Sequence, residues 1–110
     1  MAKPTGVKAT TVTYNSISIK WDKTKGADCY YIWYGEKNGK NTNRTKEIAA
    51  SKTSYKIKHL APSTNYEIQV EAYKNRSNGK LGSFARSKTI TVKTKALNKP
   101  IVKTKIKMLK

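Results

Sequence analysis

The chain has 110 residues, a mass of 12.4 kDa and a net charge of +18, from 24 Lys and Arg against six Asp and Glu. This length fits one domain and excludes a second catalytic or regulatory domain. Hydrophobic residues make up 36% of the chain, enough for a core, and no apolar run approaches the length of a membrane-spanning helix. Because all but three of the basic residues are Lys, we expect a diffuse anionic partner rather than a bidentate phosphate or guanine site.

Apolar residues recur with a period of two along the chain, and no stretch keeps a helical apolar stripe for three turns. In chain order this alternation predicts strands over residues 7–13, 17–21, 29–36, 44–49, 54–57 and 65–73, and an interrupted last strand over 83–87 and 88–94. Polar loops rich in Gly and Asn separate several of them. Seven short strands at this spacing predict an all-β fold, a seven-stranded antiparallel Greek-key β-sandwich.

One segment carries a family signature. Residues 60–72 read Leu-Ala-Pro-Ser-Thr-Asn-Tyr-Glu-Ile-Gln-Val-Glu-Ala and resemble the fibronectin type III motif, in which Leu, Pro, Thr and Tyr precede alternating apolar residues. Trp21, the aromatic run over 30–34 and the Gly-Ser-Phe-Ala-Arg-Ser segment over 82–87 fit the same family in order and spacing. The resemblance is strongest to modules of bacterial surface proteins, polysaccharide-degrading enzymes and phage structural proteins. It implies a sandwich over residues 1–96, followed by a lysine-rich tail over 97–110.

The family resemblance also implies a role for Tyr66, whose ring would lie in the core while its hydroxyl binds nearby backbone in a tyrosine corner. Trp21 would fill the centre of the sandwich. The residues that we expect to be buried together share inward positions in the strand alternation; they are Ile17, Ile19, Trp21, Tyr30, Ile32, Leu60, Tyr66, Ile68, Val70, Ile90 and Val92. These side chains are predicted to be structural.

The same alternation predicts what lies on the opposite side. If Tyr30 and Ile32 point inward, Tyr31 and Trp33 point outward, and Tyr73 does so by the same argument on a neighbouring strand. The prediction is an exposed aromatic patch that includes, with two polar neighbours, Tyr31, Trp33, Tyr73, Gln69 and Glu71. Such a patch is either a protein interface, a platform for stacking sugar rings, or a set of cross-strand pairs that only stabilises the sheet.

Catalytic groups are scarce. His59 is the only imidazole and is expected in a loop, without an acid within three residues. Cys29 is the only cysteine, so no internal disulfide forms, and it has no adjacent partner that would activate a thiolate. The six acids show neither a metal-binding nor a glycosidase pattern. We therefore expect no catalytic residue, no metal and no cofactor, and a protein that is not an enzyme.

The lysine-rich tail is a second candidate binding segment. Residues 88–110 hold eight Lys and no acid, and Pro100 separates the tail from the last strand. We expect the tail to be disordered, to pair with an edge strand of another subunit, or to lie on an anionic surface. Apolar residues and Lys alternate among its docking candidates, which are Ile101, Val102, Lys103, Lys105, Ile106, Lys107, Met108, Leu109 and Lys110. A tail of this kind favours a complete small protein over a segment cut from a longer one.

Three classes of function remain open. The first is a non-catalytic structural subunit of a larger assembly such as a phage particle, located in the virion and docked on protein subunits with an acidic surface. The alternative is a spacer, or a glycan- or protein-binding module, of a secreted bacterial surface protein or polysaccharide hydrolase, located outside the cell; its partner could be an anionic polysaccharide. The third is nonspecific nucleic-acid binding driven by Lys.

Overall fold

The computed structural model describes residues 2–37, 43–74 and 82–97, and every regular element in these ranges is a β-strand. The strands are β1 (Lys8–Val12), β2 (Ile17–Lys20), β3 (Cys29–Glu36), β4 (Asn43–Arg44), β5 (Ile48–Ala49), β6 (Ser54–Ile57), β7 (Asn65–Lys74), β8 (Ser83–Arg86) and β9 (Ile90–Lys93). They match the seven predicted strands, two of which are divided into two pieces.

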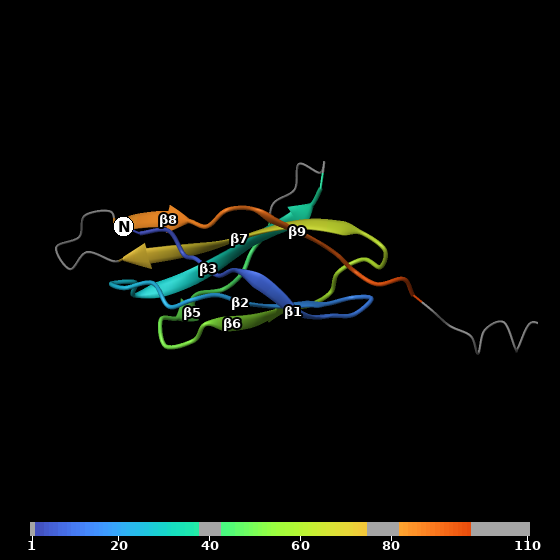
Figure 1. Ribbon diagram of the computed structural model, residues 1–110, viewed down its shortest axis with the longest axis horizontal. Helices are drawn as coiled ribbons and strands as arrows, with labels where there is room; N and C mark the ends of the chain where they lie inside the picture. The colour runs from blue at the N-terminus through green and yellow to red at the C-terminus, as the bar shows by residue number, and fades with distance from the viewer. Residues whose placement is uncertain (1, 38–42, 75–81, 98–110) are drawn as a thin grey trace, which may run out of the picture.

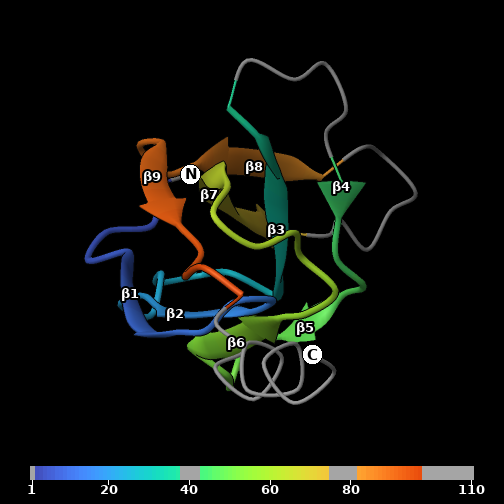
Figure 2. The same ribbon diagram turned by 90° about the vertical axis from the view of Figure 1, so that its right-hand side faces the viewer.

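The strands form two antiparallel sheets packed face to face, as the view along the strands shows (Figure 2). One sheet has the order β1-β2-β6. The other has the order β4-β3-β7-β8, with β5 also paired to β3 and β9 also paired to β7. The chain changes sheet between β2 and β3, returns between β5 and β6, and changes again before β7 (Figure 1). This is the expected all-β sandwich.

The predicted single strand over residues 44–49 is wrong, because this segment pairs with β3 only at its two ends. Arg44 lies opposite Trp33, and Ile48 lies opposite Tyr30, so the segment advances four residues while β3 advances three. Thr45 occupies the interruption, where its hydroxyl accepts a hydrogen bond from the backbone N–H of Ile32. An extra residue of this kind is a bulge, which divides the strand into β4 and β5.

The last strand is interrupted, as the sequence predicts, and Ser87 fills the interruption. The N–H of Ser87 donates to the carbonyl of Val70 at 2.8 Å, and its hydroxyl accepts from the N–H of Val70 at 2.9 Å. The side chain thus replaces one main-chain partner at a point where the regular ladder stops. As a result β8 and β9 both pair with β7, along different halves of that long strand.

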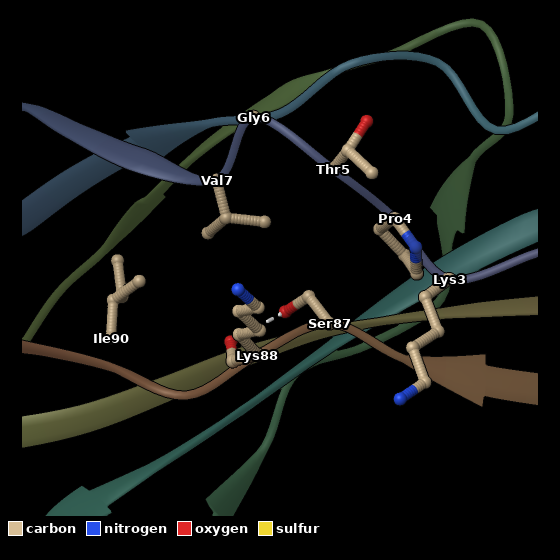
Figure 3. A pocket seen from close by; sticks show the side chains of 8 residues that line it. All are labelled: Lys3, Pro4, Thr5, Gly6, Val7, Ser87, Lys88 and Ile90. Carbon is tan, nitrogen blue, oxygen red and sulfur yellow. Dashed lines mark hydrogen bonds between the residues drawn. The ribbon is translucent and has the colours of Figure 1, made fainter.

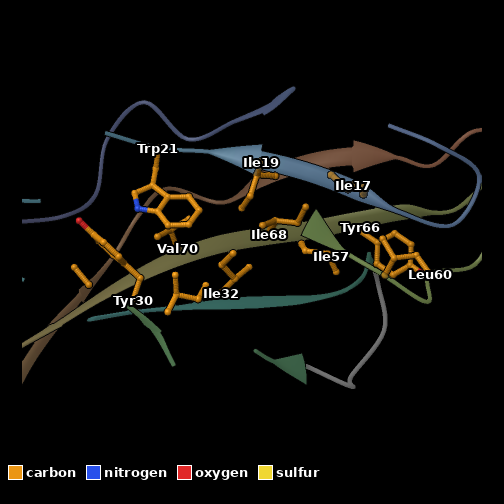
Figure 4. Close-up of a cluster of buried hydrophobic side chains, with 12 residues drawn as sticks. Ile17, Ile19, Trp21, Tyr30, Ile32, Ile57, Leu60, Tyr66, Ile68 and Val70 are labelled. Atoms are coloured by element: carbon orange, nitrogen blue, oxygen red, sulfur yellow. The ribbon is translucent and has the colours of Figure 1, made fainter. Parts of the chain in front are cut away.

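The core lies between the two sheets and is built from the predicted inward positions (Figure 4). Ile17, Ile32 and Val70 are fully buried, and the ring of Trp21 meets that of Tyr30 edge to face with centroids 5.3 Å apart. Nine of the eleven residues predicted to be buried together are buried, including Trp21, Ile32, Leu60, Tyr66, Ile68 and Val70. Two other predicted core residues, Ile90 and Val92, are only half-buried, because β9 forms an edge of its sheet.

Tyr66 occupies the corner where the chain passes from β6 to β7. Its hydroxyl accepts a hydrogen bond of 2.7 Å from the backbone N–H of Ala61 while its ring is buried. Thr94, which is 2% exposed, holds the same loop from the other side: its hydroxyl donates to the carbonyl of Ala61 and accepts from the N–H of Thr64. A side chain of β7 and one directly after β9 therefore both bind the backbone of Ala61.

Candidate interaction face

The strand register brings the predicted patch residues together on the outer side of the larger sheet. Tyr31 lies opposite Glu71, and Trp33 lies opposite Gln69. Tyr73 lies opposite Cys29, one position further along the same face. Because side chains two residues apart in a strand share a face, all of these groups project away from the core. The two central strands, β3 and β7, thus hold the aromatic side chains side by side.

The expectation that these aromatic residues are exposed is wrong, since Tyr31, Trp33 and Tyr73 are all half-buried. Arginine side chains cover two of them, Tyr31 and Trp33. The Cζ atom of Arg44 lies 4.5 Å from the centroid of the Tyr31 ring and 5.6 Å from that of Trp33. The Cζ atom of Arg86 lies 4.4 Å from the centroid of Trp33. These are cation–π distances, and they place guanidinium groups over rings that would otherwise face solvent.

The two arginines reach the rings from opposite edges of the sheet. Arg44 belongs to β4, next to β3, whereas Arg86 belongs to β8, beyond β7. Arg86 also forms an ion pair with Glu71, with 3.2 Å between Nε and Oε2, and Glu71 is only 5% exposed. A buried carboxylate needs such a partner, because burial without one is costly. Glu71 therefore orients Arg86 over Trp33.

Tyr31 contacts two further side chains of the patch and its surroundings, Tyr73 and Glu47. Its ring meets that of Tyr73 edge to face with centroids 6.2 Å apart, and its hydroxyl donates to Glu47 Oε1 at 3.5 Å. Cys29 lies opposite Tyr73 in the register and is 1% exposed. Burial raises the pKa of the Cys29 thiol, and the Glu47 carboxylate raises this pKa further. The thiol therefore stays protonated at neutral pH and acts as a packed apolar group.

Gln69 is committed to the fold rather than free for a ligand. Its side-chain Nε2 donates to the carbonyl of Ser87 at 2.9 Å, at the interruption between β8 and β9. The predicted role of Gln69 in binding stays a prediction, but its amide nitrogen already has a partner within the chain.

Phe84 extends the patch and was not among the predicted binding residues. It lies in β8 opposite Tyr73, and 58% of its surface is exposed. Gly82, directly before β8, lies against the end of β7, where a Cβ atom would collide with the backbone carbonyl of Lys74. The absence of a side chain at position 82 therefore lets the two strands approach each other. We call the whole surface the arginine–aromatic face, defined as Tyr31, Arg44, Trp33, Tyr73, Phe84 and Arg86. The chain has only three Arg, and two of them lie on this face. This scarcity was the one feature of the sequence that could have indicated a special role for them.

A hollow in the described surface lies away from this face, between the N-terminal segment and the β8–β9 connection (Figure 3). It has a volume of about 350 Å³ and is lined by Lys3, Pro4, Thr5, Gly6, Val7, Ser87, Lys88 and Ile90. Figure 3 shows Val7 and Ile90 projecting toward one another across it, with the Ser87 hydroxyl bonded to Lys88. None of the eight lining residues is an acid, an imidazole or a thiol, so the hollow holds no pair of groups for proton transfer.

His59 lines a second, shallower hollow together with several Lys and two Tyr. No carboxylate lines it, so nothing there would act with the imidazole as an acid–base pair. Within the described ranges, no three His, Cys, Asp or Glu side chains gather as they would around a metal ion. No helix in the described part of the chain is long and apolar enough to span a membrane. The predicted docking residues of the tail, 101–110, lie outside the described residues.

Fold and surface together define a class of protein: a two-sheet sandwich that presents side chains on a sheet face, on the immunoglobulin-like plan. The family model for the fibronectin type III domain matches residues 2–89, and the chain belongs to this family. The recognition made from residues 60–72 is thus confirmed.

Several relatives are animal proteins. The collagen alpha-1(XII) chain of the rabbit is 27% identical over 89 residues, which cover 79% of this chain and 14% of that protein. The chain therefore spans about one-seventh of the length of this relative. Among solved structures, the FN5 domain of Drosophila Lar has a TM-score of 0.68 at 28% identity, covering 86% of this chain and 97% of that one. The fn3 domain of human contactin 1 has a TM-score of 0.71 at 24% identity, covering 91% and 82%.

These comparisons do not support the expected likeness to bacterial and phage proteins. The relatives named above are animal proteins, and a location in the virion finds no support among them. The broader prediction, a fibronectin type III module with a structural or binding role, agrees with them.

Proposed function

We propose that the chain is a non-catalytic binding module of an extracellular or cell-surface protein, and that it binds a protein partner through the arginine–aromatic face. The observation that carries the proposal is the stacking of Arg44 and Arg86 on Tyr31 and Trp33. Tyr, Trp and Arg dominate the energetically important positions of protein interfaces. The collagen relative supports an extracellular location.

A protein partner fits this face better than a sugar ring does. Sugar stacking needs an open aromatic face, whereas Arg44 lies 4.5 Å above the centroid of Tyr31 and Arg86 lies 4.4 Å from that of Trp33. Guanidinium groups held in this way offer fixed N–H donors to a carboxylate or a backbone carbonyl. The exposed Phe84 adds an apolar anchor beside them. The partner would therefore present an acidic group next to an apolar recess.

Photo-crosslinking tests the proposal with a matched pair of exposed aromatic positions. Phe84 and Tyr14 are exposed by 58% and 45%, but only Phe84 belongs to the face. A photoreactive phenylalanine analogue at position 84 of the full protein should yield one discrete protein adduct in its native setting, and the same analogue at position 14 should not. Arg86→Glu should abolish the adduct, because it reverses the charge beside Trp33. Equal adducts from both positions, or none from position 84, would contradict the proposal.

A further inference from the structure

Along one side of the sandwich, no strand ladder joins the two sheets. β1 forms an edge of the smaller sheet, and β9 forms an edge of the larger one, where it pairs with β7. Among the described strands, no ladder connects β1 with β9. The hollow drawn in Figure 3 opens on this side, between the segment that leads into β1 and the connection that leads into β9. We call it the N-terminal hollow.

The wall that the N-terminal segment provides is held in place by Asp22. The backbone N–H of Asp22 donates to the carbonyl of Thr5 at 2.9 Å, and the hydroxyl of Thr5 donates to Asp22 Oδ2 at 3.3 Å. Gly6 follows with a φ angle of 68°, and a Cβ atom there would collide with the carboxylate of Asp22. Glycine therefore lets the segment turn close against Asp22 before it enters β1.

The opposite wall is held in place by Ser87, which is 4% exposed. Its N–H and its hydroxyl both bind the backbone of Val70, and the hydroxyl also donates to the carbonyl of Lys88 at 3.0 Å. Both walls are thus bonded to the body of the sandwich. Because the walls are ordered before a ligand arrives, binding avoids the loss of entropy that ordering a loop would cause.

The inner surface of the N-terminal hollow is aliphatic. Val7 and Ile90 project toward one another across it (Figure 3), and both pack against the hydrophobic core. Pro4, which is buried, adds a third apolar side chain. None of the lining residues is aromatic, so the hollow offers no ring on which a planar ligand would stack. An aliphatic chain therefore fits this surface better than an aromatic ring does.

Two ammonium groups flank the aliphatic surface from opposite walls. Lys3 belongs to the N-terminal segment and Lys88 to the connection between β8 and β9, and both are exposed. Within the described residues, the one ion pair joins Arg86 and Glu71, so neither Lys has a carboxylate partner in the chain. Ammonium groups beside an apolar recess favour a ligand with a negative group at one end and a hydrocarbon chain at the other.

We propose that the N-terminal hollow binds a small aliphatic carboxylate. Its hydrocarbon chain would lie against Pro4, Val7 and Ile90, and its carboxylate would accept from the ammonium groups of Lys3 and Lys88. The volume of about 350 Å³ is at the lower end of the range for small-molecule sites, so the ligand is a single short chain. The hollow lies away from the arginine–aromatic face, so this ligand and a protein partner bind without competing.

Other anions fit the N-terminal hollow less well. No Arg lines it, so it lacks the planar fork that binds a phosphate group through two hydrogen bonds. It has no ring on which the base of a nucleotide would stack. An inorganic anion would use the two ammonium groups but would leave the aliphatic surface in contact with water. Only a ligand with both parts uses both features of the hollow.

Isothermal titration calorimetry of the full chain with sodium octanoate tests the proposal. Butyrate has the same charge on a shorter chain and should bind more weakly by about tenfold or more, because it buries fewer methylene groups. Octanol has the chain without the charge and should also bind more weakly than octanoate. No detectable binding of octanoate, or equal affinities for octanoate and octanol, would overturn the proposal.

Charge variants test the two lysines. The double variant Lys3→Gln and Lys88→Gln should weaken octanoate binding about three- to tenfold, the usual effect of losing two exposed ion pairs. The matched control, Lys37→Gln with Lys52→Gln, removes the same charge from exposed positions outside the hollow and should change the affinity less than about twofold. Equal losses in the two double variants would overturn the proposal, since binding would then follow net charge alone.

Nuclear magnetic resonance measures where the chain of the ligand lies. Nuclear Overhauser effects should connect the methylene protons of octanoate with the methyl groups of Val7 and Ile90. They should not connect them with Val12, which is also half-buried but does not line the hollow. Equal effects at Val12 would show nonspecific adsorption and overturn the site. N-acetylleucine that bound more tightly than octanoate, with the same dependence on Lys3 and Lys88, would replace the aliphatic carboxylate by the carboxyl end of a peptide.

Discussion

Two residues of the loop before β7 have left-handed backbones without being glycine. The φ angles are 62° at His59 and 52° at Ser63. Such a conformation costs about 1–2 kcal/mol for an ordinary residue, so it persists only where the surroundings enforce it. Tyr66 and Thr94 provide this enforcement, because their hydroxyls bind the backbone of Ala61, between the two positions, and Thr94 also accepts from the N–H of Thr64, directly after Ser63.

The hydroxyl of Tyr66 is therefore expected to contribute to stability apart from its ring. Tyr66→Phe keeps the ring in the core but leaves the N–H of Ala61 without its partner, and it should lower the free energy of unfolding by about 1 kcal/mol or more. Denaturant titration measures this change. Tyr14→Phe is the matched control, since Tyr14 is 45% exposed and should unfold at the same midpoint as the parent. If Tyr66→Phe also left the midpoint unchanged, the corner would not stabilise the fold.

Thr94 shows where residue-scale prediction stops. The fibronectin type III resemblance implied the role of Tyr66 from a local motif that includes it. Thr94 lies 33 residues after Ala61, at the end of β9, and nothing in its own neighbourhood distinguishes it from the Thr at position 91. Its burial and its two partners follow from the way the last strand passes beside the loop, which is a property of the tertiary fold.

Side chains connect four strands of the larger sheet in addition to its backbone ladder. Arg44 in β4 and Arg86 in β8 both lie over Trp33 in β3, and Arg86 also pairs with Glu71 in β7. The edge strands β4 and β8 are short, so their backbone hydrogen bonds alone hold them weakly. The stacked arginines are expected to fasten both edges to the centre of the sheet.

A double-mutant cycle measures this coupling. Arg86→Gln and Trp33→Leu, separately and together, should reveal an interaction free energy of about 0.5–1 kcal/mol, the usual size of a cation–π contact at a partly exposed site. Loss of the Glu71 ion pair occurs in both backgrounds and cancels in the cycle. The same cycle between Trp33→Leu and Lys93→Gln, which lies in β9, should give a value near zero. Equal coupling in the two cycles would contradict the stacking.

At the element scale, alternation predicted the strands and the face on which Tyr31 and Trp33 lie, but not what covers them. The direction of a side chain depends on its own strand, which the sequence pattern indicates. Which residues cover that side chain depends on which edge strands flank its strand and on the register in which they pair. The bulge at Thr45 sets that register for Arg44, and the interrupted last strand sets it for Arg86. The alternation of apolar and polar residues in the sequence indicates neither the bulge nor the effect of the interruption on the register.

Across the whole molecule, a net charge of +18 makes stability sensitive to salt. The Debye length shortens from about 30 Å at 0.01 M to about 8 Å at 0.15 M, so added salt should weaken repulsion and raise the midpoint of unfolding. The opposed pair Lys8 and Lys20 should account for part of this. Lys20→Gln should raise the stability at low salt by roughly a few tenths of a kcal/mol, a gain that shrinks as salt increases.

Denaturant titrations of the parent, Lys20→Gln and Lys93→Gln at low and high NaCl check this expectation. Lys93 lies opposite the uncharged Asn65, so its replacement should have a smaller effect. A stability of Lys20→Gln that equals or falls below that of the parent at low salt would show that the two Lys do not repel each other appreciably.

The positions of the two chain ends have a mechanical consequence. The N-terminal segment and the segment after β9 leave the sandwich at opposite poles, so tension between them runs along the strands and loads their ladders in shear (Figure 1). The ladder of β1 is short and is interrupted by an irregularity between Ala9 and Thr11, so its bonds do not share the load evenly. Under tension β1 should detach first, giving a partly extended state before the core opens. Stretching single molecules by their ends would resolve this state as a separate step.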